Sequence, residues 1–280
     1  MKTNFLLASL LLVLWTVQSQ DIKVMSYNIR VDFGGDGENN WEFRRDFLAD
    51  QITYNAPDFI GTQEGKLHQL QFLDTALPNY ARIGRGRDNS QTQDEYSAIF
   101  YDRTRFRLVS QNTFWLSENP DTPESKSWET AYPRICTYGL FEEIKSKKRF
   151  FVFNTHMDHI SELARENGAK LILKRISEIN TKSFPVILTG DFNSEMTTGA
   201  YKTITSQMDD TRNVSKTKPF GPNGTFSGFK FNEPVNLLID YVFVSRKNVE
   251  VLRYAILSDS KNCKYPSDHL PVLAELKLLK

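Results

Sequence analysis

Short runs of apolar residues recur along the chain and are separated by polar stretches that contain glycine and proline. Each run is only a few residues long and is rich in Val, Ile, Phe or Tyr, which is typical of β-strands. The expected strands are residues 22–27, 59–61, 97–101, 106–109, 137–142, 149–154, 186–189, 239–244, 249–256 and 272–278.

A second pattern, with apolar residues three or four positions apart, predicts helices between some of these strands. The clearest example is residues 66–77, where Leu67, Leu70, Leu73 and Leu77 fall on one stripe. The chain is therefore expected to mix strands with interleaved helices. The expected helices are residues 44–52, 66–77 and 162–179, and the expected loops are residues 32–40, 117–133 and 216–231.

The first twenty residues have the pattern of a secretory leader. Lys2 precedes an apolar run over residues 5–17, and Ser19 is a small residue suited to signal-peptidase cleavage. The run is shorter than the roughly 20 residues that cross a bilayer. We expect residues 1–20 to be a signal peptide and residues 21–280 to form one domain without a transmembrane segment. A core strand or an uncleaved anchor is the alternative.

The mature chain has balanced charge and few cysteines. Lys and Arg number 35 against 34 Asp and Glu, and removing Lys2 with the leader leaves 34 of each. The overall charge therefore does not indicate a nucleic-acid partner. Cys136 and Cys263 either form a disulfide or remain two thiols. They lack the paired CxxC spacing of a zinc site.

Side chains that can bind metal or phosphate recur at the ends of the predicted strands. Rigid strands hold such side chains in place, and α/β proteins gather their sites there. Each residue alone has an ordinary structural explanation as a turn residue, a cap or a surface charge. Six groups at strand ends of one domain can converge on one site. They are Asn28, Glu64, Asn154 with His156, Asp191 with Asn193, Asp240, and Asp268 with His269.

The order of these residues resembles the motif series of the endonuclease/exonuclease/phosphatase superfamily. Four longer strings resemble a secreted bacterial subgroup of it: Asn28-Ile29-Arg30, Asp36-Gly37-Glu38-Asn39, Phe114-Trp115-Leu116-Ser117 and His156-Met157-Asp158-His159. The resemblance runs from Met25 to Pro271. It implies an α+β fold like that of deoxyribonuclease I, a four-layer α/β/β/α sandwich with two mixed β-sheets packed face to face. The motifs are Ser26-Tyr27-Asn28, Thr62-Gln63-Glu64, Asn154-Thr155-His156, Gly190-Asp191-Phe192-Asn193, Ile239-Asp240-Tyr241 and Ser267-Asp268-His269-Leu270-Pro271.

The resemblance implies that Asn28, Glu64 and Asp268 bind a divalent metal ion. Their amide and carboxylate oxygens suit Mg²⁺ or Mn²⁺, which keep several waters in an octahedral shell. Such a cation would neutralise the phosphate ester oxygens and allow water to approach phosphorus.

The resemblance also implies catalytic roles for five residues. Asp191 and Asn193 hold the attacking water, with Asp191 acting as its base or its electrostatic anchor. His269 contacts the phosphate or serves as base, and Asp240 fixes its ring and favours the imidazolium form. His156 donates a proton to a phosphate oxygen or to the leaving group.

Four more residues are candidates for contact with the substrate. Tyr96 and Arg134 resemble the phosphate-binding tyrosine and arginine of the family, and a guanidinium fork suits two phosphate oxygens. Arg30 and His159 are candidates for further contacts. A surface arginine and a capping histidine explain these last two residues equally well.

The chain is therefore predicted to be a Mg²⁺- or Mn²⁺-dependent hydrolase of phosphate esters that uses in-line attack by activated water. Because its charge is balanced, we expect a compact phosphorylated sugar, lipid headgroup or nucleotide as substrate, and a secreted or periplasmic monomer. A secreted endonuclease or exonuclease acting on DNA or RNA is one alternative. A non-catalytic phosphate-binding module is another. The metal and catalytic residues are expected to share one cleft.

Overall fold

The computed structural model of the chain describes residues 21–88 and 94–279, so the expected leader at residues 1–20 lies outside the described residues. The strands are β1 (Ile22–Asn28), β2 (Phe59–Gly65), β3 (Tyr80–Ile83), β4 (Tyr96–Asp102), β5 (Phe106–Trp115), β6 (Ile135–Glu143), β7 (Arg149–His156), β8 (Val186–Asp191), β9 (Met208–Asp210), β10 (Asp240–Ser245), β11 (Val249–Ile256) and β12 (Val272–Leu278). The helices are η1 (Gly37–Asn39), α1 (Trp41–Asn55), α2 (Leu67–Ala76), α3 (Glu162–Ile179), α4 (Gly199–Thr205) and α5 (Thr211–Val214). Within the described ranges, no helix has both the length and the apolar content needed to cross a membrane.

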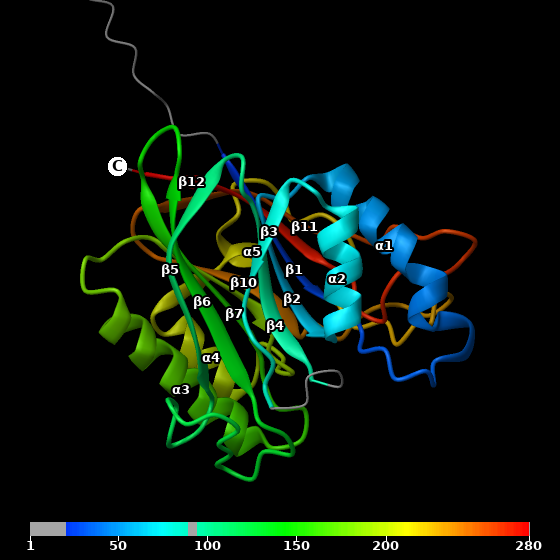
Figure 1. Ribbon diagram of the computed structural model, residues 1–280, viewed down its shortest axis with the longest axis horizontal. Coiled ribbons are helices and arrows are strands. Elements are labelled where there is room, and N and C mark those ends of the chain that lie inside the picture. Colours follow the sequence, from blue (N-terminus) through cyan, green and yellow to red (C-terminus); the bar gives the residue numbers. More distant parts are fainter. Residues whose placement is uncertain (1–20, 89–93, 280) are drawn as a thin grey trace, which may run out of the picture.

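The strands form two six-stranded sheets. The first sheet has the order β11-β12-β1-β2-β4-β3 and the second has the order β5-β6-β7-β8-β10-β9. The β1–β2 and β7–β8 pairs are parallel, whereas the other neighbours are antiparallel, so both sheets are mixed. Figure 1 shows α1 and α2 on one side of the sheets and α3 and α4 on the other. The predicted four-layer sandwich is confirmed.

An aromatic core holds the two sheets together. The ring of Phe59 in β2 lies 4.8 Å from Phe106, 4.9 Å from Phe141 and 5.3 Å from Phe150, which belong to β5, β6 and β7 of the other sheet. Tilted and T-shaped pairs at these distances each add about 0.5–1.5 kcal/mol beyond the burial of their area. The next residue, Ile60, points to the opposite face and packs in the core beneath α1 and α2. Burial on both faces explains why β2 begins with two consecutive apolar residues, Phe59 and Ile60.

A buried polar bridge crosses between the sheets beneath the site. Asn154 of β7 donates its amide to the carbonyls of Thr62 and Ala98, at 2.8 and 2.9 Å. Its oxygen accepts from Gln63 Nε2 at 2.7 Å and from Thr189 Oγ1 at 3.0 Å. These four hydrogen bonds use the whole capacity of the side chain. Asn154, which ends a predicted strand, is therefore a link between the sheets.

The two cysteines do not form a disulfide. Cys136 is fully buried in the core between the sheets, whereas Cys263 is exposed, and both are free thiols. Of the two alternatives left open by the sequence, the structure has the pair of separate thiols.

Candidate active site

A cavity of about 660 Å³ opens at the edge where β1, β2, β7 and β8 end. The carboxyl ends of both parallel strand pairs meet at this edge, so polar residues that follow these strands come together. Nine predicted site residues line the cavity: Arg30, Glu64, Arg134, His156, His159, Asp191, Asn193, Asp268 and His269.

Three predicted residues do not line this cavity. We call the part of the cavity lined by Glu64, His156, Asp191, Asn193, Asp268 and His269 its floor. Asn28 and Asp240 lie beneath this floor, 0% and 1% exposed, and are hydrogen-bonded to floor residues. Tyr96 lines a separate crevice of about 10 Å³ that it shares with Arg134 and His156. The structure therefore brings Asn28 and Asp240 to the site as supporting side chains, and it leaves Tyr96 at the back of the site.

A β-bulge turns Glu64 toward the site. In the pairing of β2 with β4, Thr62 is opposite Ala98 and Gly65 is opposite Tyr96, so two residues of β2 face one residue of β4. Glu64 adopts a left-handed backbone with φ 65°. An extra residue of this kind leaves the ladder and redirects its side chain. The Glu64 carboxylate reaches the cavity, where Oε1 accepts from Asn28 Nδ2 at 3.0 Å and Oε2 accepts from the Val31 backbone at 2.9 Å.

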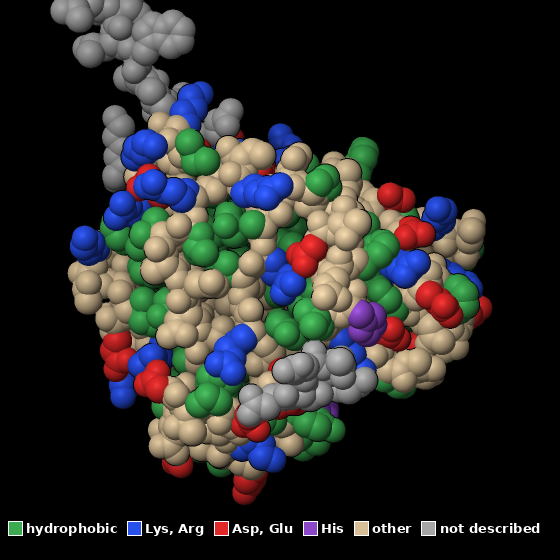
Figure 2. All heavy atoms as spheres, viewed as in Figure 1, with side chains coloured by type: hydrophobic (Ala, Val, Ile, Leu, Met, Phe, Trp, Pro, Cys, Tyr) green, Lys and Arg blue, Asp and Glu red, His purple; other side chains and the backbone are tan. Residues whose placement is uncertain are grey.

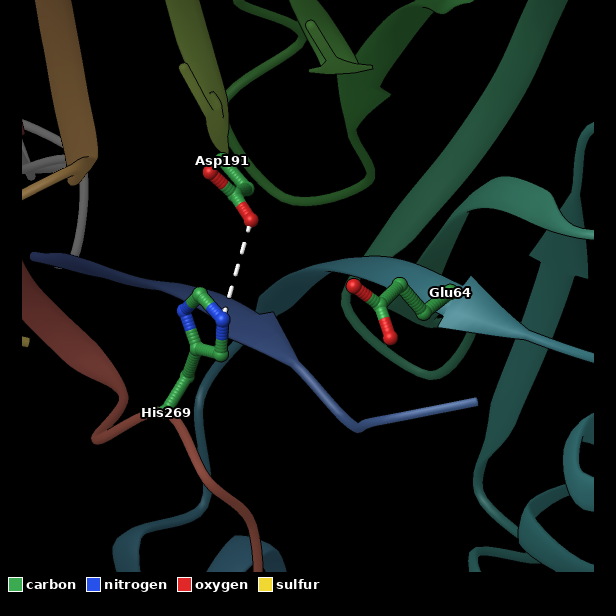
Figure 3. Close-up of side chains that lie close together, drawn as sticks. All are labelled: Glu64, Asp191 and His269. Atoms are coloured by element: carbon green, nitrogen blue, oxygen red, sulfur yellow. Dashed lines mark ion pairs between the residues drawn. The ribbon is translucent and has the colours of Figure 1, made fainter. Parts of the chain in front are cut away.

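Asp191 occupies the centre of the floor, at the end of β8. Its strand neighbours are His156 on β7 and Asp240 on β10. The Oδ2 atom of Asp191 lies 3.6 Å from His156 Nε2 and 3.8 Å from His269 Nε2. Figure 3 shows Asp191 and His269 facing one another, with Glu64 reaching toward them from β2. Residues from both sheets therefore converge on one carboxylate.

The two histidines favour opposite charge states. Burial and the nearby Arg134 guanidinium hold the pKa of His156 well below its usual range. Burial also disfavours a charged His269, but the Asp240 carboxylate, which accepts from His269 Nδ1 at 2.8 Å, raises the pKa of His269 well above its usual range. Burial and the negative charge of Asp240 raise the pKa of Asp191 to about 7. Pairs of groups driven apart in this way are suited to separate acid and base roles.

The donor set at the floor fits a divalent cation. One atom from each of Glu64, Asp191 and His269 lies within 4.8 Å of the others, in buried or half-buried surroundings, and because His269 is held in its positively charged form the carboxylate oxygens are the metal donors of this group. Burial raises the pKa of Asp268, which also lines the cavity, and the neighbouring Glu64 carboxylate adds to this effect. Carboxylates crowded into a buried space are stabilised by a cation, and hard oxygen donors suit Mg²⁺ or Mn²⁺.

Asn28 takes part in this cluster through its amide nitrogen. Nδ2 donates to Glu64 at 3.0 Å and to Asp191 at 2.9 Å, whereas Oδ1 accepts from the Arg30 backbone at 3.0 Å. Ligation of a metal ion by Asn28, as predicted, requires the amide to turn over so that its oxygen faces the carboxylates. In the present arrangement Asn28 orients both carboxylates and links β1 to β8.

Asn193 is held beside Asp191 in a left-handed turn with φ 46°. Its backbone N–H donates to Asp191 Oδ1 at 2.9 Å, and its Nδ2 donates to the carbonyl of Met157 at 3.1 Å. The amide oxygen of Asn193 is the part of the side chain left to accept a hydrogen bond from a ligand in the cavity.

The cavity also contains residues that sequence reasoning missed. Lys66, Arg87, Glu95 and Tyr132 line it, together with Phe33 and Phe226. Arg87 lies between the predicted helix at residues 66–77 and the predicted strand at residues 97–101, and Tyr132 lies in the expected loop at residues 117–133. Neither residue follows a predicted strand, so no pattern in the chain identified them.

Solved structures of other proteins resemble this one over nearly its whole length. An endonuclease/exonuclease/phosphatase family protein from Bacteroides thetaiotaomicron is 38% identical, with a TM-score of 0.89, and the match covers 93% of this chain and 99% of that one. A mannosyl-6-phosphatase from the same species is 39% identical, with a TM-score of 0.86, over 91% of this chain and 99% of that one.

Sequence comparison gives the same assignment. Nocturnin from Drosophila melanogaster is 24% identical over 94% of this chain but only 48% of its own length, so the chain spans about half of that relative. A profile of the Endonuclease/Exonuclease/phosphatase family matches residues 25–269, which include every predicted metal and catalytic residue. On this match and on the solved structures, the chain belongs to the endonuclease/exonuclease/phosphatase family.

Proposed function

We propose that the protein hydrolyses a compact phosphate ester in a reaction that depends on Mg²⁺ or Mn²⁺. The observation that carries the proposal is the position of Asp191 between two histidines of opposite charge preference, beside the Glu64 carboxylate. Water, a proton acceptor and a positively charged donor are the requirements for in-line attack on phosphorus.

Each residue of the floor has a separate role in the proposed reaction. Glu64 and Asp268 would hold the cation with Asn28, and the bound cation would neutralise phosphate oxygens. Asp191 and Asn193 hold the attacking water, and Asp191, with its raised pKa, accepts a proton from it. His269, kept positive by Asp240, donates to a phosphate oxygen as charge develops there. His156, held neutral, is placed to donate a hydrogen bond from its ring N–H to the leaving oxygen.

A small substrate suits the cavity better than a polymer. The three arginines that line the cavity are each within 4 Å of a carboxylate: Arg30 with Asp36 at 3.0 Å, Arg87 with Glu95 at 2.8 Å, and Arg134 with Asp158 at 3.6 Å. Proteins that follow a nucleic-acid backbone present grooves of uncompensated positive charge. On the face shown in Figure 2, Lys and Arg side chains gather toward the end of the molecule where β12 lies. Positive and negative side chains are mixed over the rest of this face.

The comparisons support a phosphate monoester as the substrate class. The structure of the mannosyl-6-phosphatase from Bacteroides thetaiotaomicron matches 91% of the residues of this chain. A monoester releases one alcohol when water attacks, and the open cavity of about 660 Å³ has room for a group the size of a sugar. A nuclease remains the second candidate because the family also contains nucleases.

One panel of assays tests the proposal. The purified protein is incubated with Mg²⁺ or Mn²⁺ and, in separate reactions, with p-nitrophenyl phosphate, bis-p-nitrophenyl phosphate, hexose phosphates, inositol phosphates, sphingomyelin, plasmid DNA and RNA. We expect kcat/KM to be greatest for a small monoester. Preferential cleavage of DNA or RNA would instead favour the nuclease, and no turnover of any ester would favour the non-catalytic phosphate-binding module.

We also propose that residues 1–20 are a cleaved leader, so that hydrolysis takes place outside the cytoplasm. The support is the charge and apolar pattern of these residues. Mass spectrometry of protein recovered from the producing cells tests this point, since a chain that retains Met1 to Gln20 would contradict it.

A further inference from the structure

One wall of the cavity carries side chains that the proposed hydrolysis does not use. This polar wall consists of Arg87, Glu95, Tyr132 and His159, all of which line the cavity. Arg134 lies between the polar wall and the floor, because its Nη2 is 2.9 Å from His159 Nδ1 and it also lines the crevice shared with His156. A molecule whose phosphate sits on the floor is therefore within reach of the polar wall.

The side chains of the polar wall are fixed in place by one another. Arg87 donates to Glu95 through both terminal nitrogens, at 2.8 and 2.9 Å. The same guanidinium lies 4.8 Å from the centre of the Tyr132 ring. Tyr132 stacks on His159 with ring centres 6.1 Å apart and planes 18° apart. The Trp115 indole donates to the Arg87 carbonyl at 2.8 Å. A ligand thus meets a surface that is already ordered, which reduces the entropy lost on binding.

The hydrogen-bonding groups of the polar wall suit hydroxyl groups, which both donate and accept. Glu95 supplies carboxylate oxygens as acceptors, and Arg87 supplies donors. The Arg134 guanidinium can only donate, so His159 Nδ1 accepts from it and His159 Nε2 carries the proton. His159 is therefore a neutral donor. Half of the Tyr132 surface is exposed, which provides an apolar face for the C–H groups of a ring.

Buried donors beside the polar wall lack partners among the described residues. Arg134 is 4% exposed, its Nη1 makes no hydrogen bond there, and its Nε has only the Asp158 carboxylate at 3.6 Å, beyond hydrogen-bond distance. Arg87 Nε is buried and unpartnered in the same way. Leaving such donors unsatisfied is costly, so they indicate a place for oxygen atoms of a ligand.

We propose that the polar wall is a subsite for the hydroxyl groups of a neutral sugar, or a similar cyclic polyol, esterified to the phosphate on the floor. The inference rests on the proposed function and specifies its substrate class. Arg87 and Glu95 together carry no net charge, so the polar wall does not attract a second phosphate, and the Glu95 carboxylate opposes one. It therefore separates sugar monophosphates from nucleic-acid backbones.

Binding of two phosphonates to the intact protein with Mg²⁺ tests the subsite. A hexose 6-phosphonate and phenylphosphonate share the group that occupies the floor, and their carbon–phosphorus bond is not cleaved by ester hydrolysis. By calorimetry, we expect the hexose compound to bind at least about 10-fold more tightly, the effect of one hydrogen bond to a charged group. In Glu95→Gln and in Tyr132→Ala this ratio should fall to less than about 3-fold.

Control variants distinguish an effect on the subsite from an effect on folding or on catalysis. Tyr54→Ala removes a tyrosine that is 88% exposed on α1, and it should keep the wild-type ratio. Glu95→Gln conserves shape, so it tests the idea even if Tyr132→Ala does not fold. Equal binding of both phosphonates, or an unchanged ratio in both variants, would overturn the subsite. The expected ratio without turnover of any phosphate ester would refute the proposed function alone, whereas turnover without the ratio would refute the subsite alone.

Discussion

Asp240 and His269 form a pair in which one side chain sets the state of the other. Asp240 is 1% exposed, and its Oδ2 lies 2.8 Å from His269 Nδ1, so the ring is fixed with Nε2 directed toward Asp191. A carboxylate in this position selects the tautomer and favours the imidazolium form. Under the proposed function the charge on His269 acts on the transition state, and Asp240 acts only through His269.

Replacing either residue should therefore reduce turnover through the same interaction. We expect His269→Ala to lower kcat by at least about 100-fold with a much smaller change in KM, because the interaction strengthens in the transition state. Asp240→Asn should also lower kcat. The double variant should be little worse than His269→Ala, because the effects of residues that act as a unit are not additive. Steady-state kinetics on the four proteins measures this.

Thermal unfolding of the same four proteins provides the control. If His269→Ala lowers the melting temperature but leaves the rate per folded molecule unchanged, His269 has only a structural role. Wild-type turnover in both single variants would remove the catalytic assignment and favour phosphate binding without catalysis.

The two thiols should differ sharply in reactivity. Burial raises the pKa of the Cys136 thiol, and the side chain has no exposed surface, whereas Cys263 is exposed. Because the thiolate is the reactive form and must be reached by the reagent, Cys263 alone should react in the native protein. Ellman's reagent should titrate one thiol in the native state and two in denaturant. Finding no thiol in denaturant without reductant would mean that the two cysteines are bonded.

At the scale of elements, the approach of the two sheets depends on Gly61 in β2. A methyl group at this position would lie 2.1 Å from Thr189 Oγ1 and 2.5 Å from Asn154 Oδ1. Gly61→Ala should therefore displace the buried bridge that Asn154 forms between the sheets. We expect a loss of about 1–3 kcal/mol in the free energy of unfolding, the usual cost of overpacking. Urea denaturation measures it.

Gly168 is a matched control for this substitution. It lies in α3, where an added methyl group would come no closer than 3.4 Å to the flexible side chain of Leu116. Alanine is favoured over glycine inside a helix by roughly 1 kcal/mol. Gly168→Ala should be neutral or stabilising, and an equal loss of stability in both variants would contradict the role given to Gly61.

Asp158 joins two loops that carry the polar wall. It accepts from Thr130 Oγ1 at 2.9 Å and from the Ala131 backbone at 3.1 Å in one loop, and from the backbones of Ile160 and Ser161 at 3.0 and 2.7 Å in the other. Asp158→Ala removes the partner of three backbone N–H groups and of the buried Arg134 guanidinium 3.6 Å away, whereas Thr130 Oγ1 keeps the carbonyl of Tyr132. We expect a loss of about 3 kcal/mol or more in the free energy of unfolding.

Denaturant titration measures this loss, and an exposed aspartate gives the comparison. Asp46 has an exposed side chain beside Arg45 on α1, so Asp46→Ala should change stability by less than about 0.5 kcal/mol. If Asp158→Ala were as mild, the two loops would not depend on Asp158 for their order.

Strands with a clear run of apolar residues could be predicted from the sequence, and strands without such a run could not. The strands that carry the site are buried on both faces, so their apolar runs and the polar residues after them are visible in the chain. β5 continues to Trp115 although the sequence predicted an end at residue 109, because outward residues of this edge strand face solvent and are polar. β9 is only Met208–Asp210, too short and acidic to show a pattern. The bulge at Glu64 depends on pairing with β4, which the sequence does not state.

Across the whole molecule, the site is a product of the sandwich. Glu64 comes from the first sheet and Asp191 from the second, and they meet because both parallel strand pairs end at the same edge. The motif order allowed the sequence to predict this meeting. It did not predict the polar wall, because Arg87 meets Glu95 through a backbone hydrogen bond and a side-chain ion pair, and meets Tyr132 through a ring contact, and the order of residues in the chain indicates none of these contacts.

Because residues of both sheets meet at this site, we make a further prediction about the stability of the domain. A cation held by Glu64, Asp268 and Asn28, beside the Asp191 carboxylate of the other sheet, would bind only the folded chain, so its binding would oppose unfolding of the entire domain. A ligand that binds only the folded state stabilises it by about 2.7 kcal/mol at 100 times its dissociation constant, which for a chain of this size corresponds to roughly 5–10 °C in Tm. We therefore expect Mg²⁺ or Mn²⁺ to raise the melting temperature of EDTA-treated protein, and EDTA to abolish turnover.

The variant Glu64→Gln isolates the cause of that shift. It keeps the size of the side chain and removes one of the two carboxylates that would hold the cation, so the rise in Tm with Mg²⁺ or Mn²⁺ should largely disappear. Its metal-free form should melt at or below the wild-type temperature, because burial opposes the charged Glu64 carboxylate but His269 and the hydrogen bonds from Asn28 and Val31 outweigh it and lower the pKa of Glu64. Differential scanning calorimetry with and without the cation measures both effects. An equal rise in Tm for both proteins would place the cation elsewhere, and full activity after exhaustive chelation would reject a metal-dependent mechanism.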